Sequence, residues 1–188
     1  NSRNKKYGVP VNNPFVNTPG ALPEIYAYGL RNGQRFAWDS RNGNLFLADI
    51  GQNIVEKVTL VPAGANLGWN LWEGSYRFMS LQGVALPDPK PRSDPKITYP
   101  VAEYAQPDPL LQPQSADMPS GEIFYFSADK LPSGGQDAIR RVILRSSGAD
   151  KTMLQLIQEK NTAQGKMPST RSDLRLSAGP NNQVLLLN

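Results

Sequence analysis

The chain has 188 residues, of which 39% are hydrophobic and 19% charged, with a formal net charge of +4, and it is long enough to bury the core of one ordinary domain. It contains no cysteine and no histidine, which excludes disulfides, thiolate metal sites and Ser-His catalytic pairs within this sequence. The basic residues are scattered and no apolar run approaches the ~20 residues of a membrane span. We therefore expect neither a nucleic-acid partner nor a membrane span.

The first third of the chain predicts a series of short strands. The segment Glu24–Leu30 alternates and is rich in Tyr and Ile, and further strands are predicted at Gln34–Trp38, Asn44–Asp49 and Val55–Val61. They follow one another every ~10 residues with turn residues between them, which is typical of an antiparallel all-β fold. The pair Asn42-Gly43 predicts a hairpin with a type I′ turn, because both residues tolerate positive φ.

The section from 76 to 120 is rich in proline and predicts an irregular excursion. Proline lacks the main-chain donor that a central strand needs and breaks helices, so regular structure is disfavoured there. The section also carries buriable side chains, namely Ile97, Tyr99, Val101 and Tyr104. We therefore expect an ordered excursion lying on a β scaffold rather than a flexible linker.

The last third of the chain predicts further strands. They lie at Glu122–Ser127, Arg140–Arg145, Asp173–Leu176 and Gln183–Leu187, and Met153–Gln158 is either a strand or a short helix. The turn-and-strand phrases DSRNGNLFLAD and GPNNQVLLLN are similar to each other. Repeated units of short strands every ~40–50 residues indicate the blades of a β-propeller. At that period the chain holds about four blades at most, which predicts an incomplete ring.

The motifs YGLRN, DIGQN and NLGW occur in this order within YAYGLRNGQRFAWDSRNGNLFLADIGQNIVEKVTLVPAGANLGW. This stretch resembles the glucose/sorbosone dehydrogenase family, which includes the soluble pyrroloquinoline-quinone-dependent sugar dehydrogenases, and DLRLSAGPNNQVLLLN resembles the family's last blade. The resemblance implies a six-bladed β-propeller of which this chain supplies about the C-terminal half. Residues 1–75 would form the family-core blade segment, 76–120 the Pro-rich excursion and 121–188 the C-terminal blades.

The resemblance also implies a function. The family transfers a hydride from a polyhydroxy substrate, such as an aldose or sorbosone, to pyrroloquinoline quinone with the assistance of Ca²⁺, in the periplasm or outside the cell. The family's catalytic histidine would lie in the N-terminal half, which is missing here, so we expect no catalytic residue in this chain. The alternative is a secreted or periplasmic propeller that serves as a binding module and has lost the cofactor chemistry.

The resemblance assigns candidate site residues at three places. Arg31 and Asn32 match the pair that contacts the quinone, and a guanidinium suits the carboxylates and carbonyls of that cofactor. Arg171 and Arg175 lie where the family has basic residues near the cofactor's carboxylates. The alternative for Arg31 is a strand-end arginine followed by an Asn-Gly turn.

Gly51 and Gln52 stand where the family supplies main-chain carbonyls to calcium. Calcium prefers hard oxygen ligands of this kind. The alternative is a plain β-turn in which Asp49 and Asn53 bond local amides.

Overall fold

A computed structural model of the chain describes residues 6–52, 55–79, 90–105, 123–131, 139–168 and 174–187. The residues divide into two compact units, the first comprising 1–115 and 131–137 and the second 116–130 and 138–188. The described parts consist mainly of strands, with one α-helix and one 3-10 turn. In chain order they are β1 (Gly33–Trp38), β2 (Leu45–Asp49), β3 (Val55–Leu60), β4 (Trp72–Glu73), β5 (Tyr76–Arg77), β6 (Ala102–Ala105), β7 (Phe124–Tyr125), β8 (Arg140–Arg141), β9 (Leu144–Ser146), β10 (Ala149–Lys151), α1 (Met153–Ala163), β11 (Arg175–Ala178), η2 (Pro180–Asn182) and β12 (Val184–Leu187).

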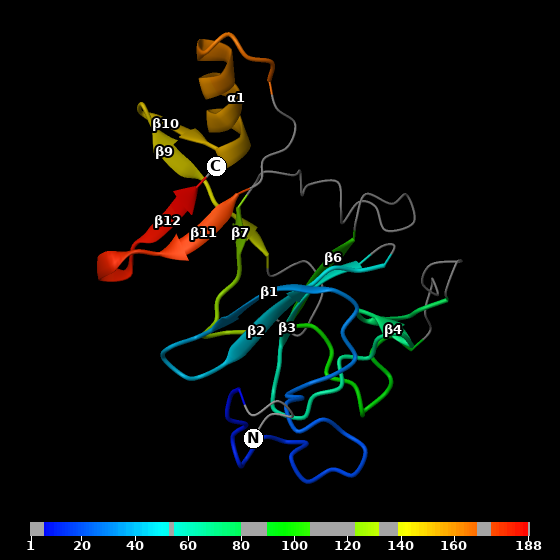
Figure 1. Ribbon diagram of the computed structural model, residues 1–188. Helices are drawn as coiled ribbons and strands as arrows, with labels where there is room; N and C mark the ends of the chain where they lie inside the picture. The colour runs from blue at the N-terminus through cyan, green and yellow to red at the C-terminus, as the bar shows by residue number, and fades with distance from the viewer. Residues whose placement is uncertain are drawn as a thin grey trace. The chain divides into compact units, whose positions relative to one another are not determined.

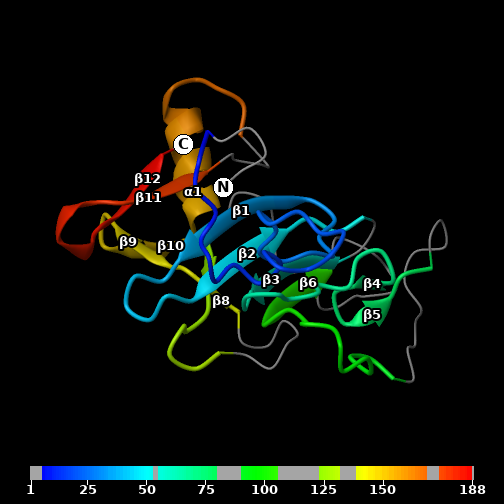
Figure 2. The same cartoon turned by 60° about the horizontal axis from the view of Figure 1, so that its bottom comes forward.

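The first unit is built on an antiparallel sheet of four strands in the order β1-β2-β3-β6 (Figure 1). A four-stranded antiparallel sheet is the unit from which propeller blades are made. Strand β6 comes from the Pro-rich section and lies at the sheet edge beside β3, a position that tolerates neighbouring prolines. The short β4–β5 hairpin precedes β6 in the chain, and both of its strands are visible in Figure 2.

The predicted hairpin at Asn42-Gly43 is confirmed, but the predicted turn type is wrong. Only Gly43 has positive φ, at 75°, whereas a type I′ turn needs it at both central residues. The loop instead runs from Asp39 to Asn44, whose carbonyl oxygen accepts the Asp39 amide at 2.8 Å. The Asp39 carboxylate also accepts the amide of Arg41 at 3.0 Å, so this loop is held by a side chain that the two-residue turn would not require.

The predicted strand at Glu24–Leu30 is wrong as a regular strand. Only Tyr28 forms a bridge, an isolated parallel one with Asn66. The Tyr28 amide donates to Ala65 O at 2.9 Å, and the Leu67 amide donates to Tyr28 O at 2.8 Å. The extended run ends at Gly29, whose φ of 77° a side-chain-bearing residue rarely adopts. This pairing places the YGLRN motif against the NLGW motif.

The core of the first unit lies beneath these two motifs. Leu47, Val61 and Ala65 are buried, and partly buried apolar side chains pack around them: Tyr26, Ala27, Leu30, Leu45 and Leu67. Strand β3 alternates between buried and half-buried positions. Its buried face carries Val55, Lys57 and Thr59, so a lysine shares a face with core residues.

The second unit consists of two-stranded pairs and a helix. The pairs are β7–β8, β9–β10 and β11–β12, and the single strand predicted at Arg140–Arg145 is divided between β8 and β9. The ambiguous segment is helix α1, which begins at a capping box formed by Thr152 and Gln155. Lys151 and Glu159 form an ion pair of 2.7 Å between β10 and α1, which lie side by side in Figures 1 and 2. No helix in the described parts has the length and apolar character needed to cross a bilayer.

Candidate functional site

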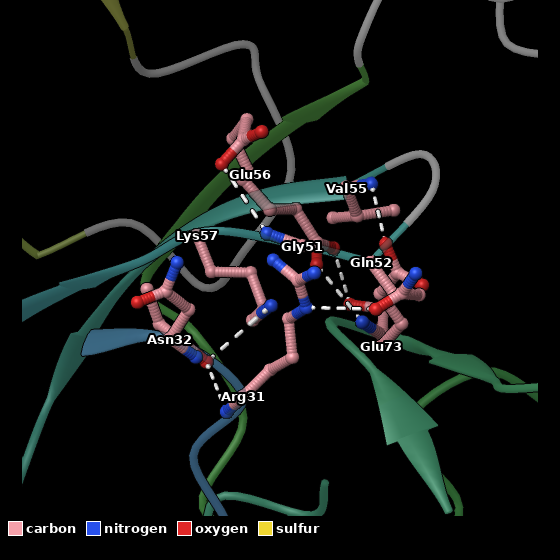
Figure 3. A network of polar contacts seen from close by, with 11 residues as sticks. Arg31, Asn32, Gly51, Gln52, Val55, Glu56, Lys57 and Glu73 are labelled. Atoms are coloured by element: carbon pink, nitrogen blue, oxygen red, sulfur yellow. Dashed lines mark hydrogen bonds and ion pairs between the residues drawn. The ribbon is translucent and has the colours of Figure 1, made fainter. Parts of the chain in front are cut away.

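The motifs YGLRN and DIGQN meet through the carboxylate of Asp49. Asp49 is the last residue of β2, and its Oδ1 accepts the main-chain amide of Asn32 at 2.6 Å, while its Oδ2 accepts that of Arg31 at 3.3 Å. The amide of Ile50 donates back to Asn32 O at 3.1 Å. Arg31 and Asn32 directly precede β1, because the strand predicted at Glu24–Leu30 does not form, and they are tied to the end of β2 and to Ile50 (Figure 3).

The side chain of Arg31 joins the two predicted groups of site residues. Its Nε donates to Gln52 Oε1 at 3.0 Å. Within the parts of the chain that the structure describes, its terminal nitrogens contact no acceptor and it forms no ion pair. The Arg31 Nε thus donates to a neutral amide oxygen, and the terminal nitrogens of the guanidinium can donate hydrogen bonds to a ligand.

Asn32 also retains hydrogen-bonding capacity. Its Oδ1 accepts from Gln34 Nε2 at 3.3 Å, and its side-chain amide nitrogen donates to none of the described residues. An amide donor beside a guanidinium is a suitable pair for carbonyl and carboxylate oxygens. The donor set of Arg31 and Asn32 therefore fits an anionic ligand such as a quinone that carries carboxylates.

A buried lysine compensates the charge of Asp49. Lys57 of β3 stands opposite Asp49 in the sheet register, and its Nζ lies 3.5 Å from Asp49 Oδ2. The two side chains are only 6% and 2% exposed, and Lys57 Nζ has no hydrogen-bond partner in the described chain. Removing Lys57 would leave the Asp49 carboxylate buried without its counter-ion, which is strongly unfavourable. Asp49 is thus paired with Lys57, so Arg31 is not needed to neutralise it.

The loop after Ile50 is fixed by two further carboxylates. The Gly51 amide donates to Glu56 Oε2 at 3.3 Å, and the Val55 amide donates to Glu73 Oε1 at 3.0 Å. Glu73, in β4, is fully buried with 0% exposure. A Cβ on Gly51 would lie 2.5 Å from Glu73 Oε1 and closer still to the carbonyl oxygen of Val55, so only glycine fits here. The main chain at Gly51 is therefore held by Glu56 and packed against Glu73 and the Val55 carbonyl.

The described residues contain no group of three or more His, Cys, Asp or Glu side chains placed to hold a metal. The side-chain oxygen of Gln52 is already an acceptor for Arg31. A calcium ion at this loop would therefore depend on main-chain carbonyls of Gly51 and Gln52 and on oxygens of a bound ligand. In the β-turn alternative Asp49 would bond local amides, but in the structure its carboxylate accepts the amides of Arg31 and Asn32 in the YGLRN motif. Asn53 lies outside the described residues.

A further charged side chain, Glu103, lies on the neighbouring strand β6. Glu103 stands opposite Lys57, accepts the Ser75 amide at 2.9 Å and the Ser75 hydroxyl, and lies 4.0 Å from the guanidinium of Arg92. Burial raises the pKa of Glu103, although the Ser75 hydrogen bonds and the charges of Arg92 and Lys57 act in the opposite direction. Asp49, Lys57, Glu103 and Arg92 form a row of alternating charge, which we call the ionic row.

The structure brings together four of the six predicted site residues: Arg31, Asn32, Gly51 and Gln52. Arg175 is an exposed residue of β11 in the second unit, where its Nη1 donates to Leu174 O at 3.1 Å, and Arg171 lies outside the described residues. The sequence interpretation missed the supporting residues Lys57 and Glu73, and it gave Asp49 only the role of bonding local amides. One signal was available, since the alternation in VEKVTL places Lys57 on the same face as Val55.

The fold and the comparisons with known proteins identify the class. A crystal structure of a glucose dehydrogenase superposes with a TM-score of 0.53 at 19% identity, covering 95% of this chain and 48% of that one. The chain is thus part of a β-propeller, as predicted. The model of the glucose/sorbosone dehydrogenase family matches residues 4–133, more than half of the chain. The chain belongs to this family, which confirms the resemblance seen in the sequence.

Two relatives are longer than the segment that this chain matches. The HIPL2 protein of Arabidopsis thaliana is 33% identical over 129 residues, which make up 68% of this chain and 18% of that protein. The aldose sugar dehydrogenase YliI of Escherichia coli strain K12 is 30% identical over 151 residues, 76% of this chain and 37% of that protein. The chain therefore spans less than half of the length of either relative.

Proposed function

We propose that this chain is the C-terminal part of a sugar dehydrogenase that transfers a hydride from an aldose-type sugar or another polyol to pyrroloquinoline quinone. The observation that carries the proposal is the hydrogen bonding of Arg31, whose position is fixed while part of its guanidinium remains available. Its main chain is fixed by Asp49, its Nε bonds Gln52, and its terminal nitrogens remain available in the described chain. Membership of the family and the similarity to an aldose sugar dehydrogenase support the same function.

The chemistry of Arg31 and Asn32 suits this role. When bound, pyrroloquinoline quinone would supply a carbonyl that accepts the hydride. The guanidinium of Arg31 would bind oxygen atoms of the cofactor and stabilise the negative charge that grows on them during the transfer. The side-chain amide of Asn32 would donate a further hydrogen bond and orient the ligand. The chain has no histidine, so the base that takes the hydroxyl proton of the sugar would belong to another part of the protein.

The proposal extends to a cation and to further basic residues. Calcium would be held by the main-chain carbonyls of Gly51 and Gln52 together with oxygens of the cofactor. Arg171 and Arg175 are proposed as additional contacts for its carboxylates. An N-terminal half of the propeller would supply the remainder of the site, and we propose that the enzyme works in the periplasm or outside the cell, in line with the family resemblance.

A non-catalytic propeller that binds a partner is the second candidate. The observation in its favour is the hydrogen bond from Arg31 Nε to Gln52 Oε1. This bond gives the Nε donor an acceptor within the protein itself, as expected for an arginine with a structural role. The propeller fold by itself does not determine which function applies. The two candidates differ in cofactor binding.

The test uses the full-length protein, reconstituted with pyrroloquinoline quinone and calcium chloride. We expect the absorbance of bound quinone after removal of free cofactor, together with reduction of a dye that depends on both the quinone and an added aldose. Samples without quinone provide the control for dye reduction. Absence of both signals would overturn the dehydrogenase proposal and favour the binding module.

A further inference from the structure

We propose that the buried pair of Asp49 and Lys57 is a positioning device for Arg31 and Asn32, an inference that rests on the quinone site proposed above. Counted over the whole residue, Asp49 is 3% exposed and Lys57 is 7% exposed. Neither side chain is accessible enough to contact a ligand itself. Their effect on ligand binding must therefore pass through the residues that Asp49 holds.

The geometry explains how one carboxylate holds two neighbouring residues. Oδ1 of Asp49 accepts the amide of Asn32 at 2.6 Å, and Oδ2 accepts the amide of Arg31 at 3.3 Å. Hydrogen bonds to a charged acceptor are stronger than those between neutral groups. Because consecutive main-chain amides are fixed by one group, the directions in which the Arg31 and Asn32 side chains leave the main chain are fixed as well.

Lys57 keeps this carboxylate in place. Its Nζ lies 3.5 Å from the Oδ2 that also accepts the Arg31 amide, and it approaches from the neighbouring strand (Figure 3). A buried carboxylate that loses its counter-ion is destabilised and tends to move toward water. Lys57 in turn faces Glu103 on its other side, which ties the pair into the ionic row.

The test compares Asp49→Asn with a matched control, Asp39→Asn, in the full-length protein. Asp39 holds main chain at the opposite end of the same β1–β2 hairpin, where its Oδ1 accepts the Arg41 amide at 3.0 Å. We measure the Kd for pyrroloquinoline quinone by titration in the presence of calcium. We expect Asp49→Asn to weaken binding about 10-fold or more, in the range usual for residues that orient ligand-binding groups, and Asp39→Asn to leave it unchanged.

A double-mutant cycle with Arg31→Ala distinguishes positioning from a general effect on stability. If Asp49 acts through Arg31, Asp49→Asn should weaken quinone binding much less in the Arg31→Ala background than in the wild type. If the fold-losses of quinone affinity in the two single variants simply multiply in the double variant, the inference is overturned. Hydrogen exchange provides a readout without cofactor, since the amides of Arg31 and Asn32 should exchange faster in Asp49→Asn than in Asp39→Asn.

A second variant covers the case in which Asp49→Asn does not fold. The double variant Asp49→Asn/Lys57→Met removes both buried charges while roughly preserving volume, so it should fold. It should still bind quinone more weakly than the wild type, because Asn has one side-chain oxygen where Asp49 uses two to accept the amides of Arg31 and Asn32. If the wild type binds quinone and Arg31→Ala weakens binding while this variant binds like the wild type, the inference alone fails. If the wild type binds no quinone, the proposed function fails, and the inference with it.

Discussion

Glu73 accepts the main-chain amide of Val55 through Oε1 at 3.0 Å, although the two residues come from different sheets of the first unit. The same oxygen lies 2.5 Å from the point where a side chain would begin at Gly51. A fully buried carboxylate and a glycine therefore fit together beneath the loop that follows β2. This contact explains why the DIGQN motif contains glycine.

We expect Gly51→Ala to lower the free energy of unfolding by about 3 kcal/mol, because the added methyl group would overlap Glu73 and the Val55 carbonyl and the loop would have to move. Gly8→Ala is the matched control, since a Cβ at Gly8 meets nothing within 4 Å. Urea unfolding of the two variants and the wild type measures the difference. Equal stability of both variants would show that the loop is not confined as described.

Glu103 should make stability depend on pH. Burial raises its pKa above the ordinary value of 4.5, so the folded state keeps this proton at pH values where the unfolded state has lost it. The contribution to folding is complete below pH 4.5 and is lost as the pH rises through the raised pKa. The wild type should therefore lose stability relative to Glu103→Gln over this window.

Urea unfolding at several pH values between the ordinary and the raised pKa checks this dependence. Glu159→Gln serves as the control, because Glu159 is a half-exposed carboxylate on α1 whose side chain is 55% exposed. With rising pH the wild type should lose stability relative to Glu103→Gln more steeply than relative to this control. A wild type that gains stability over Glu103→Gln as the pH rises would contradict the assignment.

The sequence predicted those parts of the fold that depend on local patterns. Strands β2 and β3 follow from short segments spaced ~10 residues apart between turn residues, and the loop before β2 follows from Asn42-Gly43. The Glu24–Leu30 segment alternates, but its main chain bonds the Ala65–Leu67 region in an irregular parallel manner, which no local pattern reveals. Helix α1 had a local signal that the periodicity did not show, the capping box at Thr152.

The candidate site was only partly predictable for a similar reason. Arg31, Asn32, Gly51 and Gln52 belong to motifs that are recognisable in the sequence. Their support depends on register between strands, which pairs Lys57 with Asp49 on one side and with Glu103 on the other. Because Glu103 comes from the Pro-rich section far along the chain, the ionic row could not be inferred without the sheet topology.

The capping box of α1 gives a prediction for the second unit. The Thr152 hydroxyl accepts the Gln155 amide at 3.2 Å, and Gln155 Oε1 accepts the Thr152 amide at 2.8 Å. We expect Thr152→Ala to lower stability by about 1 kcal/mol through loss of the cap. Thr162→Ala is the control at the other end of the helix, where the hydroxyl only donates to Gln158 O and alanine has the higher helix propensity. Thermal unfolding that ranks Thr162→Ala as the more damaging change would refute the assigned cap.

We propose that Arg31 is a ligand-binding cation rather than a structural one. The most direct measurement is a titration of the full-length protein with pyrroloquinoline quinone in calcium-containing buffer, comparing the wild type with Arg31→Ala and Arg35→Ala. Arg35 is an exposed arginine of β1 whose Nη1 donates only to the carbonyl of its neighbour Gln34 within the described chain. We expect Arg31→Ala to weaken quinone binding at least about 10-fold, as loss of a charge-assisted contact does, while Arg35→Ala binds like the wild type. Equal affinity of Arg31→Ala and the wild type would show that Arg31 does not bind the quinone.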